Sequence, residues 1–120
     1  MVITTIGKSG TALILAGQGA APNYIALGNG SGTELASLSG LYNEISGTRK
    51  ELTTATSNNL RKVTWTGDWS SVEMSGLDLL EFGLFTGSAG NQLWHYVNLG
   101  NGINFDGSNE LRVEITWEII

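Results

Sequence analysis

The stretch ELRVEITWEII, residues 110–120, decides the fold class because apolar and polar residues alternate along it almost without interruption. The apolar set is Leu111, Val113, Ile115, Trp117 and Ile119, and the polar set is Arg112, Glu114, Thr116 and Glu118. Successive side chains of a strand point to opposite faces, so this pattern predicts a β-strand with one buried face, to which Trp117 contributes structurally. Since the chain ends on this strand, we expect a single domain over residues 1–120 with no appended tail or linker.

Further short segments upstream have strand character. Tyr24–Leu27 is apolar and is followed by the glycine-rich stretch 28–32, and residues 49–55 form another candidate strand before a turn at 57–59. Residues 60–69 alternate, and the segments 79–86 and 92–99 flank GSAGN, which has the length and chemistry of a hairpin turn. Short strands separated by Gly and Asn turns predict a mainly β protein, an antiparallel β-sandwich or a barrel-like module.

Helix signals are confined to the first part of the chain. Ser9 or Thr11 can cap a short helix over Ala12–Ala16, which Gly17 would end. A second helix is expected over Glu34–Ile45, where apolar residues recur every three to four positions. Gly40 weakens that second helix by about 1 kcal/mol relative to Ala. The sequence therefore predicts one or two short helices in the N-terminal part.

Composition excludes several functional classes. The chain has 120 residues, enough to bury a core, and its net charge of −5 leaves no basic face for nucleic acid. It contains no cysteine, so disulfides and thiolate metal sites are excluded. The longest apolar run is too short to cross a bilayer, and a standard signal peptide is not recognisable. We expect a soluble protein that binds neither nucleic acid nor membrane.

Nucleotide-binding motifs are incomplete. Gly7-Lys8-Ser9 matches the end of a P-loop, but the motif requires a glycine at the place of Val2, with a strand before it. The glycines of residues 28–32 lack the spacing and the βαβ unit of a dinucleotide loop. We interpret the first motif as a turn and helix cap, and the second as a flexible loop. No cofactor is expected.

Candidates for catalysis or metal binding are equally weak. His95 is the only histidine, and a surface or interface role is the favoured interpretation over catalysis. Glu73, Asp78 and Glu81 are close in sequence and could act as an acid–base pair, although such residues are usually solvated. The segment Asn101–Glu110 is rich in oxygen ligands but lacks the spacing of a calcium loop, which favours a polar turn. We expect no enzymatic activity and no metal site.

Two positions in the segment 79–85 indicate a structural role. Glu81 is surrounded by apolar residues, and a buried carboxylate needs a partner, for which Arg49 or Arg61 is the candidate. Gly83 within a strand predicts a β-bulge or a close backbone approach. Both features belong to a scaffold.

Aromatic residues provide the interface candidates. The chain has four tryptophans, and tryptophan is enriched where proteins contact proteins. Trp69 and Trp94 lie near predicted turns, so we predict that they contact another subunit, together with His95 and Tyr96 beside Trp94. The alternative, in which all four tryptophans belong to the core, remains open.

Several segments carry a resemblance to a known family. YIALGNG at 24–30 is followed by Glu34-Leu35 and by Glu44-Ile45 with Arg49, then by LEFGLF at 80–85, Leu93 and the final strand LRVEITW at 111–117. In this order and spacing they resemble small β-rich virion structural proteins of tailed bacteriophages, which share an IALG-x-G segment and an E-x-GLF strand. The resemblance covers residues 7–120 and departs between Trp65 and Leu77.

The resemblance implies a structural role in a virion. The favoured expectation is a capsid decoration (cement) protein that binds the outside of the shell, which fits a compact module without a shaft. The alternative is a tail-fibre or tail-tip subunit that contacts a host receptor. The expected partners are other virion proteins, either the major capsid protein or tail proteins, and further copies of the chain in a homo-oligomer, expected to be a trimer. The expected location is the virion, assembled in the host cytoplasm.

Overall fold

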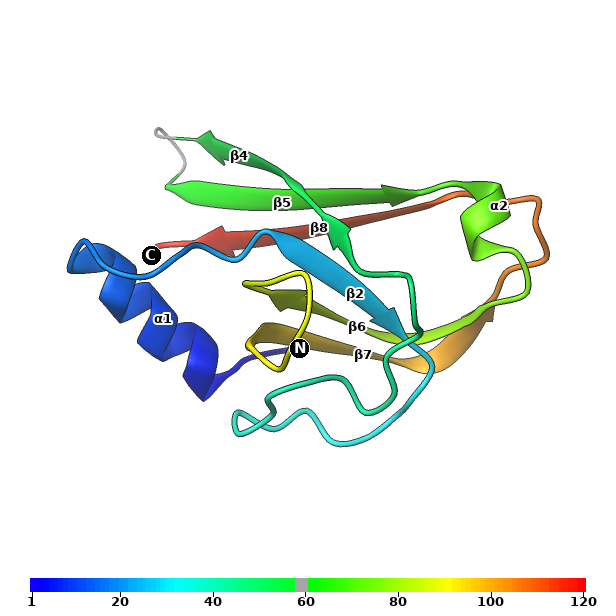
Figure 1. Ribbon diagram of the computed structural model, residues 1–120, viewed down its shortest axis with the longest axis horizontal. Helices are drawn as coiled ribbons and strands as arrows, with labels where there is room; N and C mark the ends of the chain where they lie inside the picture. The colour runs from blue at the N-terminus through cyan, green and yellow to red at the C-terminus, as the bar shows by residue number, and fades with distance from the viewer. Residues whose placement is uncertain (58–60) are drawn as a thin grey trace.

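The computed structural model describes residues 1–57 and 61–120, and the backbone alone at 55–57. It is mainly β, with two antiparallel sheets, as the sequence predicts (Figure 1). The first sheet, sheet A, has the strand order β1 (Val2–Ile3), β7 (Leu93–Asn104), β6 (Asp78–Phe85), β2 (Tyr24–Gly28) and β3 (Lys50–Glu51). The second sheet, sheet B, has the order β4 (Thr53–Ser57), β5 (Lys62–Trp69) and β8 (Leu111–Glu118). The candidate strand over residues 49–55 is thus divided between the two sheets.

The alternating stretch forms β8, as predicted. Val113 and Ile115 are buried on its inner face, whereas Arg112, Glu114, Thr116 and Glu118 are exposed. β8 pairs with β5 over its whole length, from Lys62 opposite Glu118 to Trp69 opposite Leu111. The proposed turn at 57–59 falls mostly on residues outside the described part of the chain.

The predicted hairpin of residues 79–99 is also confirmed. β6 and β7 pair antiparallel around the turn that contains residues 87–91, with register shifts between Leu79 and Glu81 and between Leu84 and Phe85. β7 continues to Asn104, five residues beyond the predicted end of the strand.

The main core fills the space between the sheets. Its largest buried members include Ile25 and Leu27 of β2, Trp65 and Trp69 of β5, and Ile115 of β8. A second cluster forms on the opposite side of sheet A, where Ala26, Phe85, Leu93 and Tyr96 pack with Leu38 and Leu41. Sheet A is therefore covered on both faces, which explains why four successive residues at the start of β7 are all buried.

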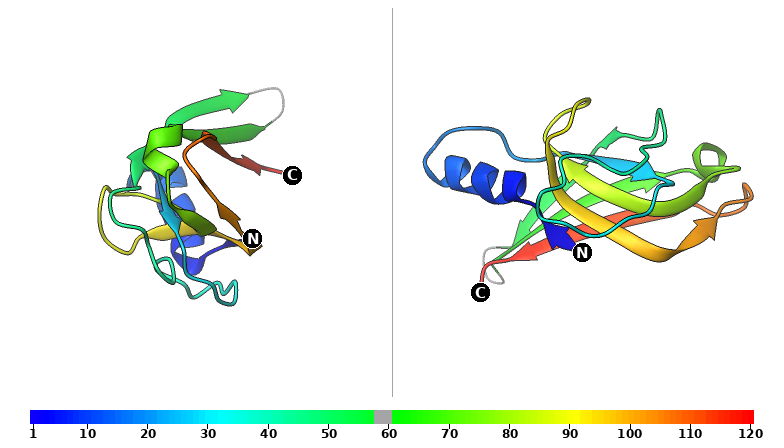
Figure 2. Two further views of the ribbon diagram at one scale, coloured as in Figure 1. Left: turned by 90° about the vertical axis from the view of Figure 1, so that its right-hand side faces the viewer. Right: turned by 90° about the horizontal axis from the view of Figure 1, so that it is seen from below.

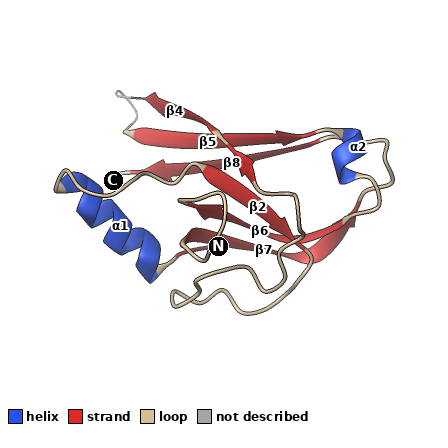
Figure 3. Cartoon of the chain, in the orientation of Figure 1, coloured by secondary structure: helices blue, strands red, loops and turns tan. Residues whose placement is uncertain are grey.

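The N-terminal helix α1 (Thr5–Leu15) begins earlier than the sequence predicts. Its N-cap is Thr4, whose Oγ1 accepts a hydrogen bond from the Gly7 N–H at 3.0 Å, so Ser9 and Thr11 lie inside the helix and do not cap it. Gly17, with φ of +79°, follows the helix end as predicted. α1 lies at one end of the molecule, and the short helix α2 (Ser71–Met74) lies at the other (Figures 1 and 3).

The predicted helix over residues 34–45 is wrong, because the structure has turns, bends and an isolated bridge there. Its apolar residues do reach a hydrophobic cluster, but from a loop. Figure 2 shows this long connection between β2 and β3 running outside the layer of sheet A. A helix does form where none was predicted, at α2, where Ser70 and Glu73 make a capping box.

Candidate functional site

Glu81 has no arginine partner, which corrects the sequence prediction. It is fully buried, and its carboxylate accepts hydrogen bonds from the backbone N–H groups of Gly30 (3.1 Å), Tyr42 (2.9 Å) and Asn43 (2.8 Å). The Tyr96 hydroxyl donates a fourth bond at 2.8 Å. Backbone amides meet the needs of the buried carboxylate because a carboxylate has about four acceptor sites. We call these five residues the Glu81 clamp.

The Glu81 clamp joins the IALG-x-G segment at 25–30 to the E-x-GLF segment at 81–85. Gly28 of the IALG-x-G segment lies directly opposite Glu81 in the β2–β6 ladder. A Cβ on Gly30 would lie 2.9 Å from the Glu81 Oε2 and 2.6 Å from the Asn43 nitrogen, so both glycines leave room for the carboxylate. The motifs therefore describe one structural unit that fastens the loop of residues 29–49 to sheet A.

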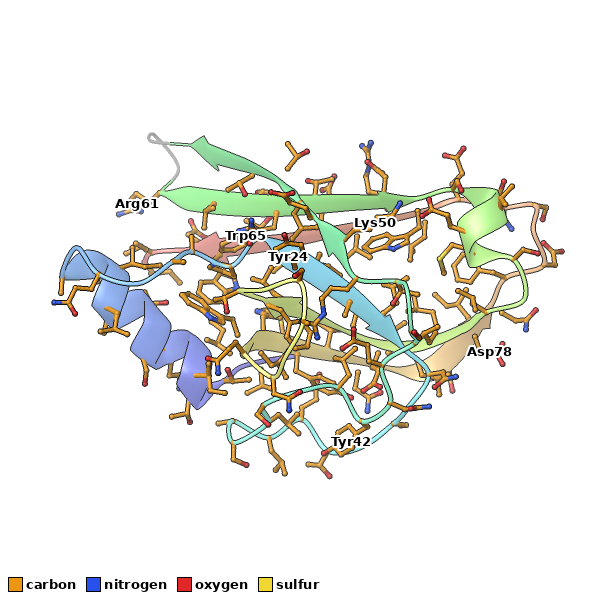
Figure 4. The ribbon with its side chains drawn as sticks, viewed as in Figure 1. Tyr24, Tyr42, Lys50, Arg61, Trp65 and Asp78 are labelled. Atoms are coloured by element: carbon orange, nitrogen blue, oxygen red, sulfur yellow. The ribbon has the colours of Figure 1, made fainter. Side chains whose placement is uncertain are left out.

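Arg49 fastens the same loop to the β6–β7 turn. It forms an ion pair with Glu44 at 2.7 Å and donates hydrogen bonds to the carbonyl oxygens of Gly87 and Gly90. Its guanidinium carbon lies 3.9 Å from the centre of the Phe85 ring. Arg49 thus has a structural role, but its acidic partner is Glu44 and not Glu81, which corrects the prediction. Arg61 lies elsewhere, directly before the first residue of β5 and near α1 (Figure 4).

Gly83 is a site of close packing. A Cβ there would lie 2.5 Å from the Leu93 Cδ1 and 3.0 Å from the Leu41 Cδ2. Gly83 itself pairs regularly with Tyr96 and Ala26, and the irregularities of β6 lie on either side of it. The close backbone approach is confirmed by the His95 carbonyl oxygen, which would lie 3.2 Å from that Cβ, whereas the alternative of a bulge at this residue is wrong.

The predicted interface residues Trp69, Trp94, His95 and Tyr96 all belong to the interior, each less than 5% exposed. The Trp69 Nε1–H donates to the Thr48 carbonyl oxygen at 2.8 Å. Burial, followed by the hydrogen bond to Glu81, raises the pKa of Tyr96 well above its usual range. Proximity to a turn gave the wrong prediction because the sandwich and the outer loop cover both faces of these strands. Trp69 and Trp94 instead fit the core alternative.

The residues considered for catalysis have separate structural partners. Glu73 forms an ion pair with Lys50 at 2.7 Å, and the hydrogen bond from Lys50, followed by one from the Ser70 backbone, lowers the pKa of Glu73. Asp78 accepts a hydrogen bond from the Asn104 amide at 2.6 Å. In the segment 101–110 the Asp106 carboxylate accepts from Ser108, and this hydroxyl and the Ser108 N–H lower the pKa of Asp106.

The described residues hold no metal cluster and no membrane-spanning helix. Over residues 1–57 and 61–120, three or more histidine or acidic side chains are nowhere grouped to hold a metal ion. Within the same ranges, neither helix combines the length and the apolar character needed to cross a membrane. Gly7 to Ser9 lie within α1, so the turn interpretation of that motif is wrong.

The strongest candidate site is an apolar groove of about 570 Å³ beside α1, which we call the α1 groove. α1 provides Ile14 and Leu15, and sheet B provides Val63, Trp65 and Trp117. Figure 4 shows Trp65 and Arg61 at this end of the molecule, near α1. The complete lining is Thr11, Ile14, Leu15, Ala21, Pro22, Arg61, Lys62, Val63, Trp65, Trp94, Trp117 and Ile119.

Three tryptophans form a fixed wall of the α1 groove. Trp117 packs edge-to-face with Trp65, with ring centres 5.3 Å apart, and stacks with Trp94 at 6.1 Å. The Trp117 Nε1–H donates to the His95 Nδ1 at 2.8 Å, which requires an unprotonated Nδ1. Burial lowers the pKa of His95 to about 4, so the imidazole is neutral at pH 7 and can accept this bond. Trp117 therefore has the structural role that the sequence predicts.

Glycines bring α1 close to this wall. A Cβ on Gly7 would lie 2.5 Å from the Trp94 carbonyl oxygen, and a Cβ on Gly10 would collide with the Trp94 ring. Gly7 and Gly10 are three residues apart and share one face of the helix. α1 can thus lie directly against β7, with a smaller hollow of about 410 Å³ that also reaches Trp94.

The rim of the α1 groove exposes large apolar side chains. Leu15 is 82% exposed and Ile119 is 76% exposed, although both border the groove. Ile14 is partly exposed beside them, and Leu13 of the same helix borders the smaller hollow. Contiguous apolar surface of this kind marks interaction sites on proteins. Sequence reasoning missed the α1 groove, although the run Ala12–Ala16 and the pair Ile119–Ile120 were its visible signals.

No protein-family model, curated protein or solved structure matches this chain.

Proposed function

We propose that the chain is a non-enzymatic structural protein of a tailed-phage virion, and that it decorates the outside of the capsid as a cement protein. The α1 groove is the observation that carries this proposal. A fixed aromatic wall and an exposed apolar rim suit a permanent contact with another protein, because burying such surface contributes roughly 25 cal/mol per Å². The partner is the major capsid protein, and the chain acts as a homo-oligomer on the shell.

The Glu81 clamp supports the same proposal from a second direction. The resemblance to phage virion proteins rests on motifs whose residues hold a loop onto a sheet, through Glu81, Gly28 and Gly30. A scaffold of this kind needs no reactive group. Glu73 forms an ion pair with Lys50, and Asp78 accepts a hydrogen bond from Asn104. These structural contacts fit a protein that acts by binding other proteins.

Localisation on intact virions by cryo-electron microscopy tests the proposal directly. Density repeated over the capsid lattice, with α1 directed toward the shell, is the expected result. Density confined to the neck, tail or fibres would overturn decoration and support the alternative of a tail-fibre or tail-tip subunit that contacts a host receptor.

A matched pair of variants tests whether the α1 groove makes the contact. Leu15 and Val72 are equally exposed, at 82% and 83%, but Val72 lies on α2 at the far end of the molecule. Shells that lack the protein are incubated with Leu15→Glu or Val72→Glu protein and then sedimented. We expect Leu15→Glu to lose binding at least tenfold and Val72→Glu to bind like the parent. Equal binding of both variants would remove the groove from the contact.

A further inference from the structure

β8 has a long strand edge that the described part of the chain leaves unpaired. It has eight residues and pairs on one side with β5, and sheet B ends there (Figure 3). An open strand edge presents a row of unpaired backbone N–H and C=O groups to any strand that can match it. An edge of this length therefore needs a partner or a device that blocks pairing.

The other edges are short or polar. β1 and β3, at the two edges of sheet A, have only two residues each. β4 is five residues long, and its sequence TTATS carries no large apolar residue. Where β7 extends past β1, the Asn98 N–H is bonded to the Glu34 carboxylate. β8 alone combines length, regular alternation and one apolar face.

We propose that β8 pairs antiparallel with β8 of a second copy, with Ile115 opposite Ile115 on a two-fold axis. This register places Arg112 opposite Glu118 of the second copy, and Glu114 opposite Thr116. On the inner face Leu111 meets the exposed Ile119, and Val113 meets Trp117. Each apolar residue thus meets an apolar residue, and the one basic side chain of the strand meets an acidic one.

The pairing with β5 extends this charge match to a row across four strands. Within one copy Asp68 lies opposite Arg112, joined by an ion pair of 2.8 Å, and Lys62 lies opposite Glu118. In the joined sheet the row would read Asp68 and Arg112 from one copy, then Glu118 and Lys62 from the other. The signs alternate along the whole row, and the two-fold axis generates the row twice.

The neighbouring symmetric registers lack this match. Centring the pair on Glu114 places that carboxylate opposite itself, and centring it on Thr116 places Glu114 opposite Glu118. Like charges directly opposite each other destabilise a strand pair. Centring on Val113 places Arg112 opposite Glu114 but leaves residues 116–118 without β8 residues opposite them. Charge and length together select the register centred on Ile115.

Cysteine cross-linking tests this register, because the chain has no cysteine of its own. Glu114→Cys and Thr116→Cys proteins are prepared separately, mixed and oxidised mildly. Directly opposite Cβ atoms are close enough for a disulfide. We expect the mixture to form a covalent dimer at least tenfold faster than either variant alone. Equal rates in the mixture and in the single variants would overturn the register.

Light scattering on the parent protein tests the assembly itself. We expect a dimer, and Arg112→Glu should raise its dissociation constant at least tenfold while circular dichroism shows a folded protein. Asp68→Ala is the matched control, since it removes the partner of Arg112 within the same copy and leaves Glu118 of the second copy in place. A monomer at all concentrations, or the trimer expected from the sequence, would overturn the two-fold contact. Trp117 and Ile119 border both contacts, but Leu15 lies outside the β8 pairing, so Leu15→Glu should remain dimeric and its loss of capsid binding would not reflect loss of the dimer.

Discussion

The Glu81 clamp and the α1 groove lie in different parts of the molecule and differ in which kind of side chain they bury and which they expose. At the clamp a charged group is fully buried and all its hydrogen bonds are made inside the chain. At the groove, large apolar side chains such as Leu15 and Ile119 remain in solvent. The first region is complete without a partner, whereas the second is a surface whose burial would be favourable. Glu81, which resembles a catalytic carboxylate in the sequence, thus serves the fold, and apolar residues such as Leu15 lie at the surface, where we propose that they bind a partner.

We expect the largest loss of stability from a variant that removes the central carboxylate of the Glu81 clamp. Glu81→Ala removes the acceptor of three backbone N–H groups and of the Tyr96 hydroxyl, all at a buried position. We expect a loss of about 3–5 kcal/mol in the free energy of unfolding, because buried donors without partners are costly. Urea denaturation followed by tryptophan fluorescence measures it.

Two further variants show which hydrogen bonds of Glu81 account for this loss of stability. Glu81→Gln keeps the shape and one acceptor oxygen and should lose less than Glu81→Ala. Tyr96→Phe removes one of the four bonds and should cost about 1 kcal/mol. If Glu81→Ala unfolds at the same urea concentration as the parent, the clamp does not hold the loop.

The next effect concerns the wall of the α1 groove and depends on pH. The folded-state pKa of His95 is about 4, below its ordinary value of 6.5, so the unfolded chain binds a proton first as the pH falls. Above pH 6.5 His95 is neutral in both states, and the free energy of unfolding has its full value. As the pH falls toward 4, protonation of His95 in the unfolded chain lowers the free energy of unfolding by about 3 kcal/mol in total.

Thermal unfolding at several pH values between 7 and 4 measures this loss. His95→Asn is the reference, because asparagine does not titrate and retains an acceptor for the Trp117 Nε1–H. The parent should lose more stability than His95→Asn over this range. Parallel pH profiles for the two proteins would mean that His95 titrates normally in the folded state.

A third effect tests close packing beside the clamp. Gly83→Ala places a Cβ 2.5 Å from the Leu93 Cδ1, so side chains must move. Overpacking of this kind costs about 1–3 kcal/mol. Gly102→Ala in the neighbouring strand β7 is the control, because its Cβ would lie no closer than 3.3 Å to the Leu80 side chain and 3.8 Å to the Leu79 carbonyl oxygen. Urea denaturation measures the loss in free energy of unfolding for both variants, and their ratio separates the effect of packing from that of the backbone. Equal small losses would show that the Leu93 and Leu41 side chains move aside at little cost.

Sequence patterns predicted the fold where one physical cause dominates. The period of two in β8 and the hairpin turn between β6 and β7 are local signals, and both elements form as predicted. The helix prediction for residues 34–45 failed because backbone N–H groups of this segment bind the distant Glu81 carboxylate instead of forming helical hydrogen bonds. Glu81 binds the backbone N–H groups of Tyr42 and Asn43, which a helix would direct along its own axis.

The candidate site was predicted less well for a related reason. Burial of Trp69 and Tyr96 depends on which segments cover both faces of a strand, and this is a property of the whole topology. The partner of Glu81 could not be found among charged residues, because every chain carries backbone amides and sequence does not single them out. The α1 groove requires Gly7 and Gly10 to bring the helix onto Trp94, a contact more than 80 positions distant along the chain.

The smallest expected effect on stability is at the groove rim, and it separates the two regions most clearly. Leu15→Glu should change the free energy of unfolding by no more than about 0.5 kcal/mol, because an exposed side chain makes few contacts to lose. The same variant should clearly reduce binding of a hydrophobic fluorescent dye to the folded protein, whereas Val72→Glu should not. Isothermal titration with the dye at pH 7 gives both affinities. A stability loss as large as that of Gly83→Ala would instead make Leu15 part of the core, and the end of the molecule at α1 would then be as complete as the Glu81 clamp.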